Sequence, residues 1–218
     1  MLANKKTLLA GCRTLSPADL KAMTAIHMHA FPSSFLTALG AGAVSRYYQW
    51  QLEGPHDAAC VGIDVNKQLA GFCLAGTFRG ATSGFIRAYR GYLGLQIALR
   101  PWVLANAEFR DKLRHGWSSL ARARRRPAAV NAPRTASFGV LAIAVEPLHQ
   151  GADLGKRMMF ECEAIARANG FARLHLTVHP ENKQAVGFYE RLGWTRVPAD
   201  ETWAGYMTKD LTTVGTVI

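Results

Sequence analysis

A buried strand that leads through a glycine-containing loop into a long helix is predicted for residues 137–169. The stretch SFGVLAIAV (137–145) is almost entirely apolar, which is typical of a strand covered on both faces of its sheet. Beyond the loop, apolar residues recur every three or four positions from Leu154 to Ile165, and Asn169-Gly170 is a typical helix stop. This pattern indicates a protein of the α/β class.

The loop, HQGADLGK (149–156), has the composition of a phosphate-binding site. Unpaired N–H groups at the start of a helix, together with the helix dipole, favour an anion. Small residues such as Gly151 and Gly155 let the backbone approach a ligand, and Lys156 adds positive charge. The loop therefore predicts an anion site at the N-terminus of this helix.

Asp153 is unexpected in such a loop. A carboxylate about 4 Å from a phosphate would repel it by roughly 4 kcal/mol at an effective dielectric constant of about 20. Aspartate also tolerates left-handed backbone angles and is a preferred N-cap. We therefore expect a functional site in which the Asp153 side chain caps its own helix and binding is weaker than glycine would allow.

Shorter helices and strands are predicted on either side of this unit. Ser16 and Pro17 begin a helix that ends at Phe31-Pro32. The other predicted elements are a helix at 42–53, a hairpin of strands 58–65 and 68–76 joined at Asn66-Lys67, a strand at 174–178, a helix at 182–192 and a strand at 205–211.

The net charge of +11 is concentrated in one segment. Residues 78–134 contain 12 Lys and Arg but only two acidic residues, a balance of +10, against +1 for the rest of the chain. Aromatic residues such as Tyr92 and Trp102 are interspersed with the arginines, and a helix is predicted at about 102–123. The segment is thus a basic, partly helical insertion into an otherwise balanced chain.

Composition also argues against several classes of protein. The four cysteines are scattered without a CxxC pair, which indicates neither a metal site nor a disulfide framework. The N-terminus does not resemble a signal peptide, and no run reaches the roughly 18 apolar residues of a membrane-spanning helix. We expect a cytoplasmic protein with reduced thiols.

Two motifs relate the chain to a known family. QGADLG (150–155) matches the pattern Q/R-x-x-G-x-G/A except at Asp153, and NKQAVGFYERLGW (182–194) follows N-x-x-A-x-x-x-Y-x-x-x-G-F with Trp194 at the last position. Together they resemble the signatures of the Gcn5-related N-acetyltransferase (GNAT) superfamily. The resemblance is clear over about 137–211 and looser over 14–76.

The resemblance implies a single domain over 1–218 with the GNAT fold. In this α/β (α+β) fold, helices flank a mixed, mostly antiparallel sheet that is splayed between its fourth and fifth strands. The basic insertion, at about 78–134, would lie between the third and fourth strands. The coenzyme-binding half would span about 137–211.

The resemblance also implies a set of site residues and acetyl-CoA as co-substrate, with no metal. Backbone groups of Ile143, Ala144 and Val145 would pair with the pantetheine arm, and Asn182 would contact the coenzyme. The Tyr189 hydroxyl would also contact it and would protonate the departing thiolate. The residues implied at the diphosphate are Gln150, Gly151, Ala152, Asp153, Leu154, Gly155 and Lys156.

The general base is less clear from the sequence. Thr177 occupies the position at which ribosomal-protein acetyltransferases of this family carry a glutamate, which puts a protein N-terminus as acceptor in doubt. Alternation along the strand places His175, Thr177 and His179 on one face, and His179 is our preferred base because it lies nearer the coenzyme. Glu146 is the next candidate, and His27 and His29 are expected to approach the acceptor site.

Two functions remain open at this stage. In the first, the chain is an N-acetyltransferase for a small-molecule amine, which an anionic group would draw to the arginines, as in a nucleotide-linked amino sugar. The stretch AFPSSFLTALG (30–40) looks like that of family members associated with bacterial polysaccharide synthesis. In the second, the chain is a coenzyme-binding module without turnover that uses its basic insertion to bind a membrane surface or nucleic acid.

The sequence allows three interpretations of the basic insertion. It is a partly helical segment exposed to solvent, a segment that binds the acceptor, or a peripheral contact with the inner face of the membrane through about 85–117. Nucleic acid is disfavoured because no nucleic-acid motif accompanies the arginines. The oligomeric state, a homodimer included, stays open.

Overall fold

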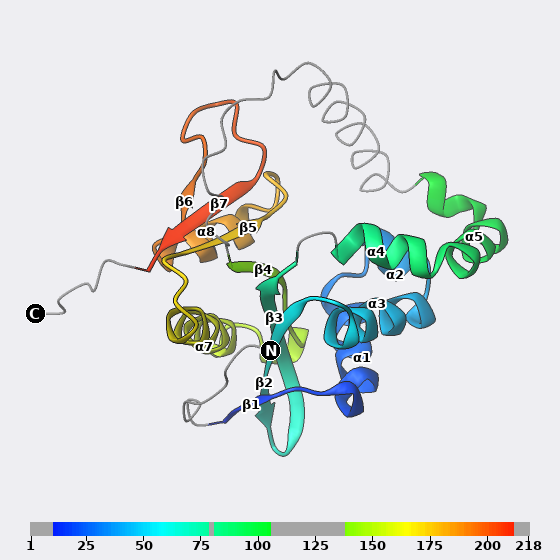
Figure 1. Cartoon of the computed structure of the whole chain (residues 1–218), viewed down its shortest axis with the longest axis horizontal. Coiled ribbons are helices and arrows are strands. Elements are labelled where there is room, and N and C mark those ends of the chain that lie inside the picture. The colour runs from blue at the N-terminus through cyan, green and yellow to red at the C-terminus, as the bar shows by residue number, and fades with distance from the viewer. Residues whose placement is uncertain (1–10, 79–80, 106–137, 212–218) are drawn as a thin grey trace, which may run out of the picture.

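A seven-stranded sheet forms the centre of the protein, with helices on both faces (Figure 1). The computed structural model describes residues 11–78, 81–105 and 138–211. The strand order is β1-β2-β3-β4-β5-β7-β6, and neighbouring strands are antiparallel except for the parallel pair β4 and β5. The strands are β1 (Cys12–Thr14), β2 (Asp57–Val65), β3 (Gln68–Thr77), β4 (Phe138–Val145), β5 (Arg173–Thr177), β6 (Thr195–Arg196) and β7 (Tyr206–Asp210). The mixed, mostly antiparallel sheet is confirmed.

Strands β2 and β3 form the predicted hairpin. Its turn residues, Asn66 and Lys67, have φ values of 51° and 64°. Two successive residues with positive φ match the right-handed twist of the two strands that they join. The hairpin is therefore set by local sequence.

Helices pack on both faces of the sheet, as Figure 1 shows with α7 on one side of β2 and β3 and α1 and α3 on the other. Side chains alternate along a strand, so neighbouring residues of β3 serve two cores. Phe72 packs with α1 and α3, whereas Cys73 packs with α7. The helices are α1 (Leu20–Ala30), α2 (Phe35–Ala38), α3 (Ala41–Glu53), α7 (Leu154–Ala168) and α8 (Lys183–Arg191).

The predicted helix boundaries are confirmed for the long elements. A 3-10 turn, η1 (Pro17–Asp19), precedes α1, and Oδ2 of Asp19 accepts a hydrogen bond from the Ser16 N–H at 2.9 Å. At the end of α7, Gly170 has a φ of 77°, the left-handed conformation that ends many helices. Sequence analysis missed α2, β1 and β6, which have two to four residues each.

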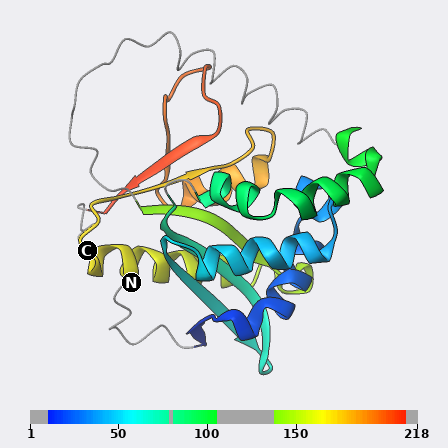
Figure 2. The ribbon, with the colours of Figure 1, turned by 45° about the vertical axis from the view of Figure 1, so that its right-hand side comes forward.

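Between β3 and β4 the chain forms further helices beside α3 (Figure 2). These are α4 (Ala81–Ala88), α5 (Arg90–Leu99) and the 3-10 helix η2 (Pro101–Ala105). Of the helix predicted at 102–123, residues 102–105 are in η2 and the remainder lies outside the described residues. A helical insertion at this place in the chain is confirmed, but its described helices begin earlier than predicted.

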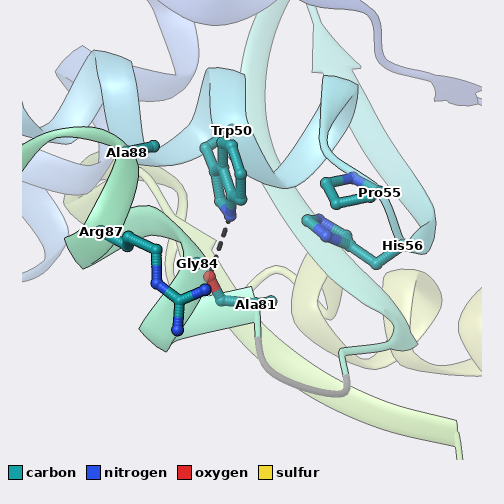
Figure 3. Close-up of a pocket in the computed structure, with 7 residues that line it drawn as sticks. All are labelled: Trp50, Pro55, His56, Ala81, Gly84, Arg87 and Ala88. Carbon is teal, nitrogen blue, oxygen red and sulfur yellow. Dashed lines mark hydrogen bonds between the residues drawn. The ribbon is translucent and has the colours of Figure 1, made fainter.

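One tryptophan anchors α4 to α3, as the close-up in Figure 3 shows. Trp50 Nε1 donates a hydrogen bond to the Ala81 carbonyl oxygen at 2.9 Å. A Cβ atom at Gly84 would lie 2.7 Å from the Trp50 ring, so only glycine allows α4 to approach this closely. This hydrogen bond and this close contact hold α4 against α3.

Candidate active site

Strands β4 and β5 separate soon after they meet, as predicted from the resemblance. Their pairing consists of Phe138 with Leu174 and Gly139 with His175. The register between β3 and β4 also shifts at Leu141, which forms a bulge. Because pairing with β5 stops, backbone groups of β4 from Leu141 to Val145 face an open cleft instead of another strand.

The cleft has a volume of about 3000 Å³ and collects residues from both halves of the chain. One wall comes from β4, the loop before α7, the start of α7 and α8. The opposite wall comes from α1, α2, α3, α4 and α5. Ile143, Ala144, Val145, Gln150, Gly151, Asp153, Leu154, Gly155, Lys156, Thr177, His179, Asn182 and Tyr189 all line it. Of the predicted coenzyme-site residues, Ala152 alone is not among the lining residues.

Asp153 adopts the left-handed conformation that the sequence allowed, with φ of 56° and ψ of 9°. Its side chain makes no capping hydrogen bond to α7, so that expectation is wrong. A capping side chain needs an extended backbone at the N-cap to reach the N–H groups of the first turn, and the left-handed backbone does not provide it. The Asp153 carboxylate is instead exposed at the edge of the cleft.

Gly155 is a point of close contact between α7 and α8. A Cβ atom here would lie 3.3 Å from Cζ of Phe188, which is tighter than most side-chain contacts. The absence of a side chain therefore lets the start of α7 pack close to α8. Lys156 follows on the cleft wall, with Nζ 5.8 Å from the centre of the Phe160 ring.

Asn182 and Tyr189 lie on α8 and both face the cleft. The Asn182 side chain is the N-cap of α8, with Oδ1 accepting from the Ala185 N–H at 3.0 Å. Tyr189 is 8% exposed and packs against Phe188 and Trp194. Burial raises the pKa of the Tyr189 phenol above its ordinary value, so the hydroxyl holds its proton.

The alternation predicted along β5 is confirmed. Leu174, Leu176 and Val178 are buried, and Thr177 and His179 are exposed and line the cleft. His175 lies farther back, where its ring packs over Gly139. Burial lowers the pKa of His175, which favours its neutral form.

The remaining base candidates separate into two groups. His29 Nδ1 lies 3.0 Å from Oε1 of Glu146, and neither residue is among those that line the cleft. His27 does line it, is buried, and has Nδ1 2.8 Å from the Tyr48 hydroxyl and Nε2 3.3 Å from Oγ of Ser34. His27 thus belongs to a hydroxyl-rich cluster in the wall formed by α1 to α5, of which sequence analysis had identified only the histidine.

The insertion supplies mainly apolar side chains to the cleft. Phe85 and Ile86 come from α4, and Leu93 and Ile97 come from α5, with Arg90 as the cation that these two helices contribute. A second hollow of about 310 Å³ lies beside Trp50 (Figure 3) and is separate from this cleft. The cleft is thus lined by backbone groups along β4 and by apolar side chains along α4 and α5.

The described residues contain neither a group of metal ligands nor a membrane-spanning helix. Within 11–78, 81–105 and 138–211, no three His, Cys, Asp or Glu residues are grouped so that they could hold a metal ion. Nor does any helix in these ranges have the length and apolar character needed to cross a membrane.

Comparisons with known proteins agree with this geometry. Residues 119–194 match the family model described as "Acetyltransferase (GNAT) family". The structure is similar to PaiA N-acetyltransferase from Thermoplasma acidophilum in complex with coenzyme A, with a TM-score of 0.54 and 13% identity over 91% of this chain and 97% of that chain.

Two further solved structures share the fold. The ribosomal-protein-S18-alanine N-acetyltransferase from Escherichia coli has a TM-score of 0.51 and 17% identity over 95% of this chain and 97% of its own. An N-acetyltransferase from Staphylococcus aureus Mu50 has a TM-score of 0.53 and 12% identity over 92% and 97%. The chain thus matches the GNAT family model over residues 119–194 and shares the fold of these acetyltransferases.

Proposed function

We propose that the chain is an acetyl-CoA-dependent N-acetyltransferase that acts on a small-molecule amine. The observation that carries this proposal is the cleft where β4 leaves β5. It joins free backbone groups of β4, the N-terminus of α7 and the buried hydroxyl of Tyr189. An enzyme that moves an acetyl group from a thioester needs these parts, because it must hold an anionic coenzyme and protonate a leaving thiolate.

In this proposal the backbone holds most of the coenzyme. N–H groups from Gly151 to Lys156 would bind the diphosphate at the positive end of the α7 dipole. Backbone groups of Ile143, Ala144 and Val145 would pair with the pantetheine arm along the free side of β4. Because Oδ1 of Asn182 caps α8, the Nδ2 amide group of this residue is what it would offer to the coenzyme.

The chemical step needs one proton donor and one proton acceptor. The neutral amine attacks the thioester carbonyl carbon, a C–N bond forms and the C–S bond breaks. Tyr189 would donate its phenolic proton to the sulfur, since burial keeps that hydroxyl neutral. His179, at the rim of the cleft, would accept the proton that the ammonium group releases.

The acceptor is proposed to be an amine on an anionic small molecule, such as a nucleotide-linked amino sugar. Support comes from Arg90 in the cleft wall and from the hydroxyl groups near His27, which suit a polyhydroxylated ligand. Thr177 lies in the cleft where a glutamate would serve a protein N-terminus, which favours a small acceptor over a protein.

Thiol release with a panel of amines and nucleotide amino sugars tests this function. With an active acceptor, Tyr189→Phe should lower kcat roughly a hundredfold and change the KM for acetyl-CoA about twofold or less. Tyr206→Phe is the matched control, because Tyr206 lies on β7 outside the cleft lining, and its kcat should equal that of the wild type.

The competing function is a coenzyme-binding module without turnover. Acetyl-CoA binding in calorimetry without thiol release from any amine would favour that module and contradict the enzyme proposal. A protein that fails to bind acetyl-CoA at low ionic strength would contradict both.

A further inference from the structure

The outer side of the insertion exposes an unusual number of large apolar side chains. We call these residues the apolar edge: Leu95, Leu99, Trp102 and Leu104. Each is between 48% and 65% exposed. They make up four of the nine large hydrophobic residues that are exposed in the described part of the chain and all fall within 95–104, so the apolar surface is concentrated here.

The apolar edge is not needed to hold the insertion in place. Helix α5 has no buried residue, and its only charged residue is Arg90 at its first position. Its inner positions, Leu93 and Ile97, pack beside Leu39 and Val103, which are buried. Leu95 and Leu99 are not part of this contact and are exposed, so no other described residue buries them.

Charge around the apolar edge indicates what it contacts. Residues 81–105 contain three arginines and no acidic residue, within a segment whose balance is +10. Arg100 binds the Leu39 carbonyl oxygen and Gln96, and Arg90 lines the cleft, which leaves the exposed Arg87 to meet an anionic surface. A second copy of this chain would bring the same positive charge into contact with the first, which opposes self-association.

Exposed leucines and a tryptophan, in a stretch that contains arginines and no acidic residue, fit a lipid interface. Leucine side chains gain free energy when they enter the acyl region, tryptophan prefers the headgroup level, and arginine attracts anionic lipid. We propose that the apolar edge docks on an anionic lipid surface and that α4 and α5 lie on the membrane in the working protein.

This docking would place the acceptor side of the cleft next to the membrane. The inner side of α5 lines the cleft with Leu93 and Ile97, while its outer side carries the apolar edge. One helix would therefore separate the lipid surface from the bound acceptor. Docking itself requires neither acetyl-CoA nor turnover, so it does not depend on the function proposed above.

Cosedimentation of the full chain with vesicles tests the proposal. Vesicles of phosphatidylglycerol mixed with phosphatidylcholine are compared with phosphatidylcholine alone, at low and high ionic strength, without coenzyme. The double variant Leu95→Glu with Leu99→Glu should bind the anionic vesicles at least tenfold more weakly, roughly the effect of keeping one leucine out of the lipid.

The matched control adds the same two charges elsewhere. Leu148 and Val197 are exposed apolar residues outside the apolar edge, so Leu148→Glu with Val197→Glu should bind vesicles within about threefold of the wild type. Thermal unfolding of both double variants should match that of the wild type, since all four positions are exposed.

Four results would overturn the proposal. The first is a wild-type protein that does not bind anionic vesicles, and the second is equal binding by both double variants. The third is equal binding to neutral and anionic vesicles, which would remove the role of the arginines. The fourth is sedimentation of the wild type as a dimer that Leu95→Glu with Leu99→Glu dissociates, which would assign the apolar edge to a second copy.

Discussion

Helices α7 and α5 both border the cleft, but they use their apolar residues in opposite ways. Eight residues of α7 are buried, and the apolar stripe of this helix faces the sheet. No residue of α5 is buried, and Leu95 and Leu99 on its outer side are exposed. The apolar stripe of α7 is buried by other described residues, whereas Leu95 and Leu99 of α5 are not.

The same contrast holds for the two walls of the cleft. The wall formed by β4, the loop before α7 and α8 is built from backbone groups, glycines and the capped start of α8, which depend on the path of the chain more than on particular side chains. The opposite wall is built from side chains of α1 to α5, including the cluster at His27. We therefore expect substitutions in the first wall to act on coenzyme binding and those in the second to act on the acceptor.

The largest predicted effect concerns the close contact between α7 and α8. Gly155→Val would place branched carbons within about 3 Å of the Phe188 ring or in the space that the diphosphate would occupy. We expect acetyl-CoA binding to weaken roughly a hundredfold, since the anion site depends on close approach of the backbone. Isothermal titration calorimetry measures the change.

A second glycine supplies the control for that prediction. Gly187 also lies in a helix, and a Cβ atom there would also lie 3.3 Å from its nearest neighbour, the flexible end of the Arg191 side chain. Gly187→Val carries the same helix-propensity cost, but it should leave acetyl-CoA affinity within about threefold of the wild type. Equal losses in both variants would show that helix stability, not the close contact, governs binding.

A smaller effect is expected where the insertion is attached. Trp50→Ala removes the hydrogen bond to Ala81 and the ring that Gly84 contacts, at a cost of roughly 2 kcal/mol for a half-buried tryptophan. Amide hydrogens of α4 should then exchange about thirtyfold faster, with little change in α7. Hydrogen-exchange mass spectrometry resolves the two helices.

Trp203 allows the opposite experiment, in which a tryptophan close to β7, instead of one that contacts α4, is removed. Its Nε1 donates to the Tyr206 carbonyl oxygen at 2.6 Å, so Trp203→Ala removes a similar bond near β7. Exchange should then increase around β7 and stay unchanged in α4. If either variant loosened both regions equally, the two halves would unfold as one unit and the contrast between them would not extend to stability.

The helices and strands over about 137–211 could be predicted well from the sequence, because the residue patterns that indicate them are local. The buried stripe of α7, the stop at Gly170 and the Asn182 cap each depend on residues within a few positions of one another. The hairpin turn at Asn66 is similarly local. The splayed strands followed from the family resemblance, since no local pattern tells a strand where its partner ends.

The missed features depend on contacts between distant parts of the chain. Strands β1 and β6 have three and two residues and exist because longer strands pair with them. The cluster at His27 requires α1 to dock on α3, which brings Tyr48 to it across 21 positions of sequence. The sequence alone could not show that one side of α5 is exposed, because the same pattern of apolar residues is found on buried and on exposed helix faces.

The smallest predicted effect concerns Asp153, which also shows why the capping prediction failed. Its left-handed backbone is a conformation that glycine adopts freely, and its exposed carboxylate lies at the edge of the cleft. In water-like surroundings a charge about 4 Å from a phosphate costs about 1 kcal/mol, so Asp153→Gly should tighten acetyl-CoA binding about fivefold.

Asp153→Asn separates charge from backbone conformation, because asparagine also tolerates the left-handed region but carries no charge. If repulsion is the cause, Asn should give most of the gain seen with Gly, and the gain should shrink as salt screens the exposed charge. A gain with Gly alone would assign the effect to backbone strain instead. Weaker binding in both variants would mean that the Asp153 carboxylate assists the loop, contrary to the arrangement described here.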